Sequence, residues 1–362
     1  MNHALSRPAL SRRTLLAGAT LGTTLAAAGW LPGAAAQGAT QAKAPPPLLR
    51  PPRLKPGDTI GLFSPSGATY ERAPYEMAAE ALAALGFKLR ESPHLRARRG
   101  HVAGTPEQRA ADINGLIADP TVHGLLAMTG GSGANRVLPL LDYAAMRRNP
   151  KVIAGFSDVT ALLNAVTART GLVTFHAPVA VSDWNVFSVA EFRAVLMDAE
   201  ARTLRNAEDK GDSLVAREHR IQTLRPGMCR GPLVGGNLAV LAAMAGSAYL
   251  PSFDGAILVL EDINEYIYRV DRMLSTLKLS GALDRLAGVV LGAFTNCGPG
   301  DGNFGTATLD EVFDDAFLPL NVPVYRGAMI GHIKKKFTVP LGLPVEMDAA
   351  AGTIRLLSPA VV

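Results

Sequence analysis

Short apolar runs alternate with segments of helical periodicity in the first half of the chain. Asp58–Gly67 is an apolar run that ends in proline and glycine, which predicts a buried strand followed by a loop. Tyr75–Phe87 has helical spacing, and Thr105–Asp119 begins with a threonine followed three residues later by Gln108, a capping-box signature. We therefore predict a helix in each of these two segments.

Two further strands follow, and each ends in a loop rich in small or polar residues. His123–Gly133 reads as a strand and a glycine-rich turn, and Lys151–Asp158 as a strand that leads into a helix starting near Val159. Continuously apolar strands that alternate with helices are typical of a parallel sheet, so we predict an α/β domain over residues 54–182. Its site is expected at the carboxyl ends of these strands.

The second half has a different character. Residues 183–219 are polar and indicate a linker with helical pieces. Beyond it, the apolar runs at 231–246, 255–265 and 286–297 predict strands, two of them followed by helices, and 322–357 is rich in β-formers with glycine and proline turns. We predict a second, β-rich domain of mixed sheet over 220–357.

The basic charge of the chain is concentrated at its start. Lys plus Arg number 36 against 31 acidic residues, but the first 36 residues hold three arginines and no acid, which leaves 33 against 31. Paired arginines at 12 and 13, a mildly apolar stretch and Ala34–Ala36 are typical of a twin-arginine export signal over 1–36, with a proline-rich leader over 37–53. We expect an exported, periplasmic protein without a stable membrane anchor, although an uncleaved anchor is the alternative. No basic stripe suggests a nucleic-acid partner.

The chain has two cysteines, Cys229 and Cys297. An exported protein can form a disulfide, but two small buried thiols explain the pair equally well. Two cysteines fit no metal motif, so they give no reason to expect a metal.

Two serines could act as a nucleophile. Ser157 stands at a strand-to-helix turn, the position of a nucleophile elbow, although Val159 breaks the G-x-S-x-G pattern. Alternatively, Ser157 or Asp158 caps the following helix. Ser132 lies in the glycine-rich turn, where Gly130 and Gly131 are better suited to offer backbone N–H groups to an oxyanion.

A serine nucleophile needs a base and an acid that orients it. Of the seven histidines, His176 and His332 both follow apolar strands and are the best candidates. Glu261 and Asp262 end a buried strand, where a carboxylate needs a partner unless it faces water. The residues alone leave these choices open.

Together these segments resemble the LD-carboxypeptidase family, which includes muramoyl-tetrapeptide carboxypeptidases and microcin C immunity proteins. The resemblance spans Leu54 to Leu357 and rests on segments in the family's order, including VIAGFSDVTALL, GPLVGGNLAVLAAMAG, ILVLEDINEYIYRVDRMLSTL and GHIKKKFTVPLG. It implies a Rossmann-like parallel-sheet N-terminal domain that carries the serine and a β-rich mixed-sheet C-terminal domain that carries the Glu and His.

Residue by residue, the resemblance implies a catalytic triad of Ser157, His332 and Glu261. The N–H groups of Asp158 and of the Gly130–Gly131 turn would form the oxyanion hole. The activity implied is release of the terminal D-alanine from a murein tetrapeptide or muropeptide, without a cofactor. Members commonly read R-G-G-Y-G where this chain has TGGSG at 129–133, so substrate contacts of that Arg and Tyr are missing.

Further substrate contacts are expected from Ser132, Asn237 and Lys334. Lys334, Lys335 and Lys336 could hold the substrate's carboxylate, or could form a solvated basic turn. Two alternatives to murein cleavage stay open: the same triad acting on an acyl-adenylate, with Trp184 stacking on the base, and a non-catalytic protein that binds wall fragments. The resemblance also suggests a homodimer.

Overall fold

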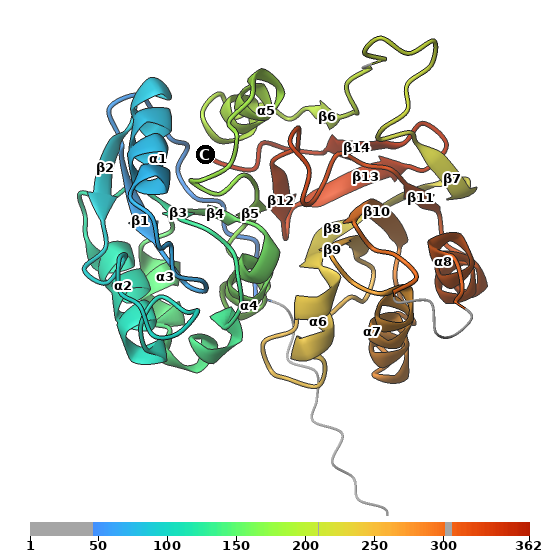
Figure 1. Cartoon of the computed structure of the whole chain (residues 1–362), viewed down its shortest axis with the longest axis horizontal. Coiled ribbons are helices and arrows are strands. Elements are labelled where there is room, and N and C mark those ends of the chain that lie inside the picture. The colour runs from blue at the N-terminus through green and yellow to red at the C-terminus, as the bar shows by residue number, and fades with distance from the viewer. Residues whose placement is uncertain (1–45, 209, 301–305) are drawn as a thin grey trace, which may run out of the picture. The chain divides into compact units, whose positions relative to one another are not determined.

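The structure of the chain is a computed structural model that describes residues 46–208, 210–300 and 306–362 (Figure 1). The predicted signal over 1–36 and most of the leader lie outside the described residues. The last part of the leader is anchored to the folded domain: the Leu49 N–H donates to Gly171 O at 2.8 Å, and the Val173 N–H donates back to Leu49 O at 2.8 Å. Within the described residues, no helix is long and apolar enough to cross a membrane.

The first sheet has six strands in the order β12-β5-β4-β3-β1-β2, and β1 to β5 run parallel. Its elements are β1 (Thr59–Phe63), α1 (Ala73–Ala84), β2 (Lys88–Glu91), α2 (Pro106–Ala118), β3 (Gly124–Ala127), α3 (Tyr143–Arg148), β4 (Val152–Gly155), α4 (Thr160–Thr170) and β5 (Thr174–His176). Short 3₁₀ turns lie at Ala134–Arg136, Leu138–Leu140, Ser157–Val159 and Leu318–Leu320. The predicted capping box is present, since Thr105 and Gln108 bond each other's backbone N–H at the start of α2.

The second sheet has eight strands in the order β6-β14-β13-β8-β9-β10-β11-β7. Strands β8 to β11 pair in parallel and the outer strands antiparallel, so the sheet is mixed. Its elements are β6 (Thr203–Leu204), β7 (Gln222–Arg225), β8 (Met228–Asn237), α6 (Leu238–Met244), β9 (Ile257–Ile263), α7 (Ile267–Leu279), β10 (Gly288–Thr295), α8 (Leu309–Phe317), β11 (Val324–Arg326), β13 (Pro344–Asp348) and β14 (Thr353–Leu356). This confirms the predicted fold class.

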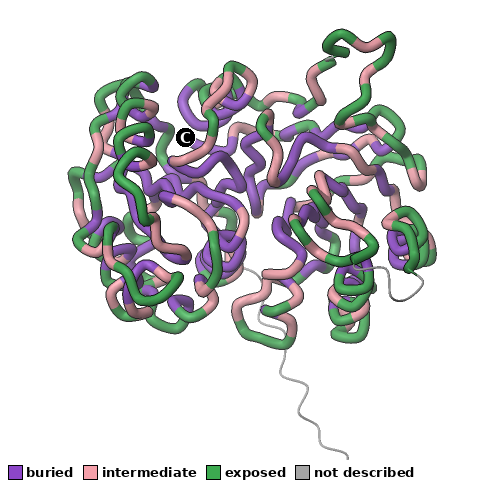
Figure 2. The backbone as a smooth tube through the Cα atoms, in the orientation of Figure 1, coloured by how far each residue is buried: buried purple, intermediate pink, exposed green. Residues whose placement is uncertain are grey.

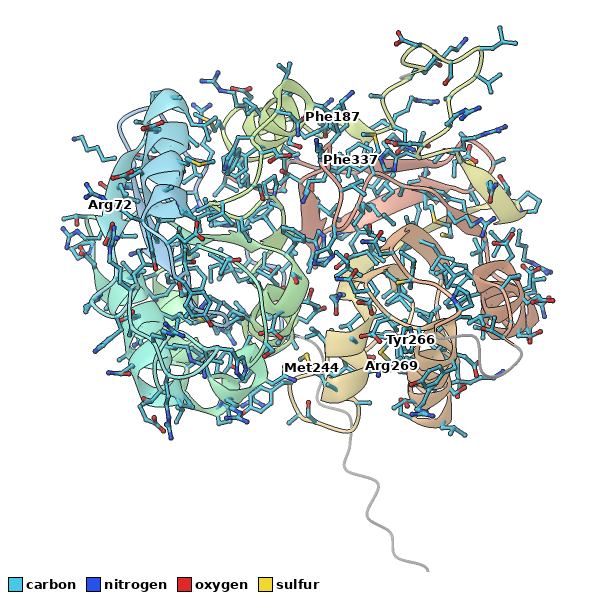
Figure 3. All side chains as sticks on the ribbon, in the orientation of Figure 1. Arg72, Phe187, Met244, Tyr266, Arg269 and Phe337 are labelled. Carbon is cyan, nitrogen blue, oxygen red and sulfur yellow. The ribbon has the colours of Figure 1, made fainter. Side chains whose placement is uncertain are left out.

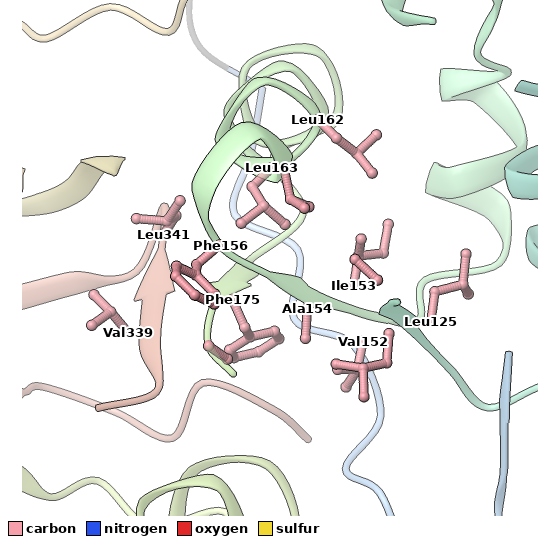
Figure 4. Close-up of a cluster of buried hydrophobic side chains, with 14 of the residues drawn as sticks. Leu125, Val152, Ile153, Ala154, Phe156, Leu162, Leu163, Phe175, Val339 and Leu341 are labelled. Atoms are coloured by element: carbon pink, nitrogen blue, oxygen red, sulfur yellow. The ribbon is translucent and has the colours of Figure 1, made fainter. Parts of the chain in front are cut away.

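The two halves are joined through a strand that sequence analysis assigned to the second domain alone. β12 (Val339–Leu341) crosses to the first sheet and pairs antiparallel with β5. Its Val339 and Leu341 are buried in the same cluster as Phe156 and Phe175 (Figure 4). Figure 2 shows that the strands of both sheets are mostly buried and that the outer helices and loops carry most of the exposed backbone. This shared core holds the ends of β4, β9 and the loop before β12 in fixed positions.

The segment over 183–219 is the one predicted as a polar linker with helical pieces. It contains α5 (Val186–Leu196), in which Phe192, Val195 and Leu196 are buried in the first core. Residues 205–208 and 210–221 then belong to the long loop between β6 and β7 (Figure 1).

Cys229 and Cys297 are both free thiols. Burial raises the pKa of each thiol to about 11, so both are protonated at neutral pH.

Candidate active site

Ser157 lies directly after β4 in a backbone conformation that serines rarely adopt. Its φ is 65°, in the left-handed region, where a non-glycine residue is strained by about 1–3 kcal/mol. The turn fits only because Gly130 approaches it: a Cβ at Gly130 would lie 2.7 Å from Ser157 Cβ. Strain of this kind is typical of a nucleophile elbow, which exposes the hydroxyl above the end of the strand.

His332 and Glu261 reach Ser157 from distant parts of the chain. His332 Nδ1 lies 2.7 Å from Glu261 Oε2, and its Nε2 lies 2.9 Å from Ser157 Oγ. Glu261 is fully buried in β9. Gly331 allows this approach, because its φ is 115° and a Cβ there would lie 2.7 Å from Glu261 Oε2. With Nδ1–H donated to the carboxylate, Nε2 is free to accept the Ser157 hydroxyl proton.

His176, the other candidate base, is buried beside this chain of hydrogen bonds and does not belong to it. Neither of its ring nitrogens has a hydrogen-bond partner among the described residues. Burial lowers the pKa of His176 to about 4, so its ring is neutral at pH 7. Its ring packs 5.9 Å from that of Phe156, whose other neighbour is His332 at 4.9 Å. The structure therefore brings His332, and not His176, to the serine.

Asp158 connects the glycine-rich turn to the Ser157 turn. Its Oδ2 accepts the Ala134 N–H at 2.8 Å, and burial raises the pKa of its carboxyl. The capping alternative is not what the structure contains, because neither Ser157 nor Asp158 caps α4 through its side chain. A Cβ at Gly130 would lie 2.9 Å from Ser157 Oγ and 3.6 Å from Asp158 N. The Gly130 backbone therefore packs directly against the Ser157 side chain and the Asp158 N–H.

A cavity of about 1090 Å³ opens over Ser157 and His332. One wall is the glycine-rich turn with Gly130 and Gly131, and another is the loop after His332. Part of the long loop between β6 and β7 also borders it. Its basic side chains outnumber its acidic ones: Lys210, Arg217, Lys334, Lys335 and Lys336 against Asp183, Asp212 and Glu218.

The predicted substrate contacts fall into different places. Lys334 lines the cavity with an exposed side chain. Ser132 is exposed and outside the residues that line the cavity. Asn237 is buried as the N-cap of α6, where its Oδ1 accepts the Val240 N–H at 3.1 Å and its Nδ2 donates to Asp262. Its side chain is thus already used within the fold.

The Trp184 side chain is also used in contacts within the fold. Its Nε1 donates to Ala180 O at 3.0 Å, and its ring packs edge-on against Phe192 at 5.2 Å. It is not among the residues that line the cavity. Sequence reasoning did not single out Phe156, which places its ring between His176 and His332, and it could not tell which of the three lysines is buried.

Two family models match the chain. Residues 60–177 match the LD-carboxypeptidase N-terminal domain and residues 230–347 the LD-carboxypeptidase C-terminal domain. The chain belongs to the LD-carboxypeptidase family. The first range contains Ser157 and the second contains Glu261 and His332. Within the described residues, no group of three or more His, Cys, Asp or Glu side chains could hold a metal ion.

Named relatives lie in this family. The Microcin C7 self-immunity protein MccF of Escherichia coli is 32% identical over 83% of this chain and 93% of its own length. The murein tetrapeptide carboxypeptidase of Pseudomonas aeruginosa is 30% identical over 70% of this chain and 82% of its own. The solved structure of MccF in complex with glutamyl sulfamoyl guanosine superposes with a TM-score of 0.78 at 27% identity, covering 87% of this chain and all of that one. Family membership supports a carboxypeptidase.

Proposed function

We propose that the chain is a serine-type LD-carboxypeptidase that releases the terminal D-alanine from murein tetrapeptides. The single observation that carries this is the hydrogen-bonded series Ser157–His332–Glu261 at the base of the cavity. The substrate class follows from the name of the Pseudomonas aeruginosa relative and from the implied activity of the family. The bond cleaved would join the L-centre of a diamino acid to D-alanine.

The geometry suits acyl transfer. Ser157 Oγ would attack the scissile carbonyl carbon while His332 Nε2 takes the hydroxyl proton, and Glu261 would hold the imidazole and stabilise its charged form. The Asp158 N–H and the Gly130–Gly131 turn would stabilise the oxyanion. His332 would then give its proton to the departing D-alanine amine. Water, deprotonated by His332, would cleave the acyl-enzyme and restore Ser157.

Two alternative functions fit the site less well. An acyl-adenylate hydrolase would use the same triad, which the similarity to MccF favours, but Trp184 does not border the cavity and so cannot stack on a base there. A non-catalytic binding protein has no need for an elbow strained at Ser157 or for a buried Glu261 that bonds His332. We therefore rank the peptidase first.

The test is mass spectrometry of a disaccharide-tetrapeptide incubated with the protein or with Ser157→Ala. The expected result is loss of one D-alanine with the wild type and none with the variant. If neither protein cleaves the tetrapeptide but the wild type cleaves an aminoacyl-sulfamoyl adenosine, the adenylate function replaces this one. If Ser157→Ala cleaves as fast as the wild type, the triad is wrong.

A further inference from the structure

Lys336 is the buried cation of the cavity. It is only 5% exposed, whereas Lys210, Arg217 and Lys334 on the same cavity are exposed. Its backbone is held firmly: its N–H donates to Ser188 Oγ of α5 at 3.0 Å. The next residue, Phe337, packs against Phe187 of α5 with ring centroids 5.6 Å apart (Figure 3). The ammonium group therefore has a defined position, whereas the side chain of a surface lysine samples many rotamers.

That position is next to the nucleophile. Lys336 Nζ lies 3.8 Å from the centroid of the Phe156 ring, a cation–π contact. Phe156 directly precedes Ser157, and its ring also packs against that of His332, with centroids 4.9 Å apart. An anionic group that contacts Lys336 from the cavity would thus lie close to the serine that attacks the carbonyl.

The ammonium lacks the partners that a structural lysine has. Among the residues that the structure describes, no carboxylate forms an ion pair with Lys336; Glu261 and Asp183 act on it only at longer range. Glu261 is engaged with His332. Lys151 shows the contrast, because its buried Nζ donates to Leu116 O at 2.9 Å and to Asp119 O at 2.6 Å. A buried charge without such partners is costly and often marks a binding site.

We propose that Lys336 binds the free carboxylate of the substrate's C-terminal residue and so places the preceding peptide carbonyl at Ser157. This rests on the proposed function, since it is the exopeptidase reaction that presents a carboxylate one residue from the scissile bond. The ammonium would donate charge-assisted hydrogen bonds to the carboxylate and would keep its cation–π contact with the Phe156 ring. An amide end would present no charge and would be selected against.

The test measures binding separately from turnover. Calorimetry compares Ser157→Ala with Ser157→Ala/Lys336→Met, using the disaccharide-tetrapeptide and the same compound with its terminal carboxyl amidated. We expect Ser157→Ala to bind the acid more tightly than the amide by roughly 10- to 100-fold, the range for hydrogen bonds to charged groups. The double variant should bind both equally weakly. Lys88→Met in the Ser157→Ala background removes an exposed charge on β2 and should keep the preference for the acid.

The outcomes separate this inference from the proposed function. If the double variant still prefers the acid over the amide, the role of Lys336 is overturned. The same holds if Ser157→Ala binds the two compounds equally or binds neither. If the acid preference depends on Lys336 but the wild type releases no D-alanine, the carboxylate site stands and the proposed reaction fails. Labelling of Ser157 by a fluorophosphonate in Lys336→Met checks that the triad still assembles.

Discussion

Replacing Lys336 with methionine should make the protein more stable while it weakens substrate binding. Burial lowers the pKa of the Lys336 ammonium from the ordinary 10.5 to about 8, against the opposing attraction of Glu261 and Asp183. At pH 7 the group is still charged, so the folded protein carries a buried ammonium that the unfolded chain would solvate. Methionine has a similar length and no charge, and its thioether can pack against Phe156.

The size and pH dependence of the gain follow from the two pKa values. A difference of 2.5 units between 10.5 and about 8 corresponds to about 3 kcal/mol, from which the lost cation–π contact subtracts roughly 1–2 kcal/mol. Because the folded-state pKa is the lower one, the folded protein loses its proton first as pH rises. Below pH 8 the wild-type free energy of unfolding is therefore lower by about 3 kcal/mol, the amount that the pKa difference sets. The protein regains this stability as pH rises from about 8 to 10.5 and has all of it above 10.5. The gain from Lys336→Met should shrink over the same window.

The assay is urea unfolding of both proteins between pH 7 and pH 11. Other lysines, tyrosines and thiols titrate in both proteins and cancel in the difference. His176, which also faces Lys336, has a pKa of about 4 and stays neutral throughout this range. Lys151→Met is the matched control: it leaves the carbonyls of Leu116 and Asp119 without their donor and should lower stability by about 1–3 kcal/mol. A Lys336→Met protein that is less stable than wild type at pH 7, or a difference independent of pH, would refute the reasoning.

Two substitutions test the geometry around Ser157. Glu261→Gln should keep the fold but lower kcat about 10³- to 10⁴-fold, because an amide at this position favours the wrong imidazole tautomer. Steady-state release of D-alanine measures this against Glu80→Gln on the exposed face of α1, and a loss below tenfold would show that Glu261 does not orient His332. Gly130→Ala places a Cβ 2.7 Å from Ser157 Cβ and should cost about 10²-fold in kcat, whereas Gly115→Ala, with no atom within 4 Å, should leave kcat unchanged. Equal rates for the two glycine variants would contradict the close packing of the elbow.

The helices and parallel strands of the first half were predictable because their signals are local. The capping box at Thr105 and Gln108 and the apolar strands each need only a few neighbouring residues to be recognised. The pairing of β12 with the first sheet was not predictable, because three residues of ordinary strand composition do not indicate which sheet they join. The burial of α5 was missed for a similar reason: polar residues around it dominate the composition, and only the tertiary contacts of Phe192 and Leu196 show it to be core.

At the site, sequence reasoning placed a serine, carboxylates and histidines at strand ends, and it left the choice between His176 and His332 to the family resemblance. The structure shows why spacing could not decide it: both histidines lie within ring-packing distance of Phe156, and only the hydrogen bonds to Ser157 and Glu261 distinguish them. The same limit applies to the basic turn. Three consecutive lysines look alike in sequence, and only the fold shows that Lys336 is buried while Lys334 is exposed.

Three unfavourable features of the fold lie at or beside this cavity. Ser157 has a left-handed backbone, Glu261 Oε1 is buried without a partner, and Lys336 carries a charge without an ion pair among the described residues. By contrast, the buried ammonium of Lys151 donates to two carbonyls. Selection for stability alone would have removed such features. In the proposed reaction each would have a role: the strain would expose the Ser157 hydroxyl, Glu261 would stabilise an imidazolium, and Lys336 would bind the carboxylate. Replacing Lys336 should therefore raise stability while it weakens substrate binding, whereas replacing Lys151 should only lower stability.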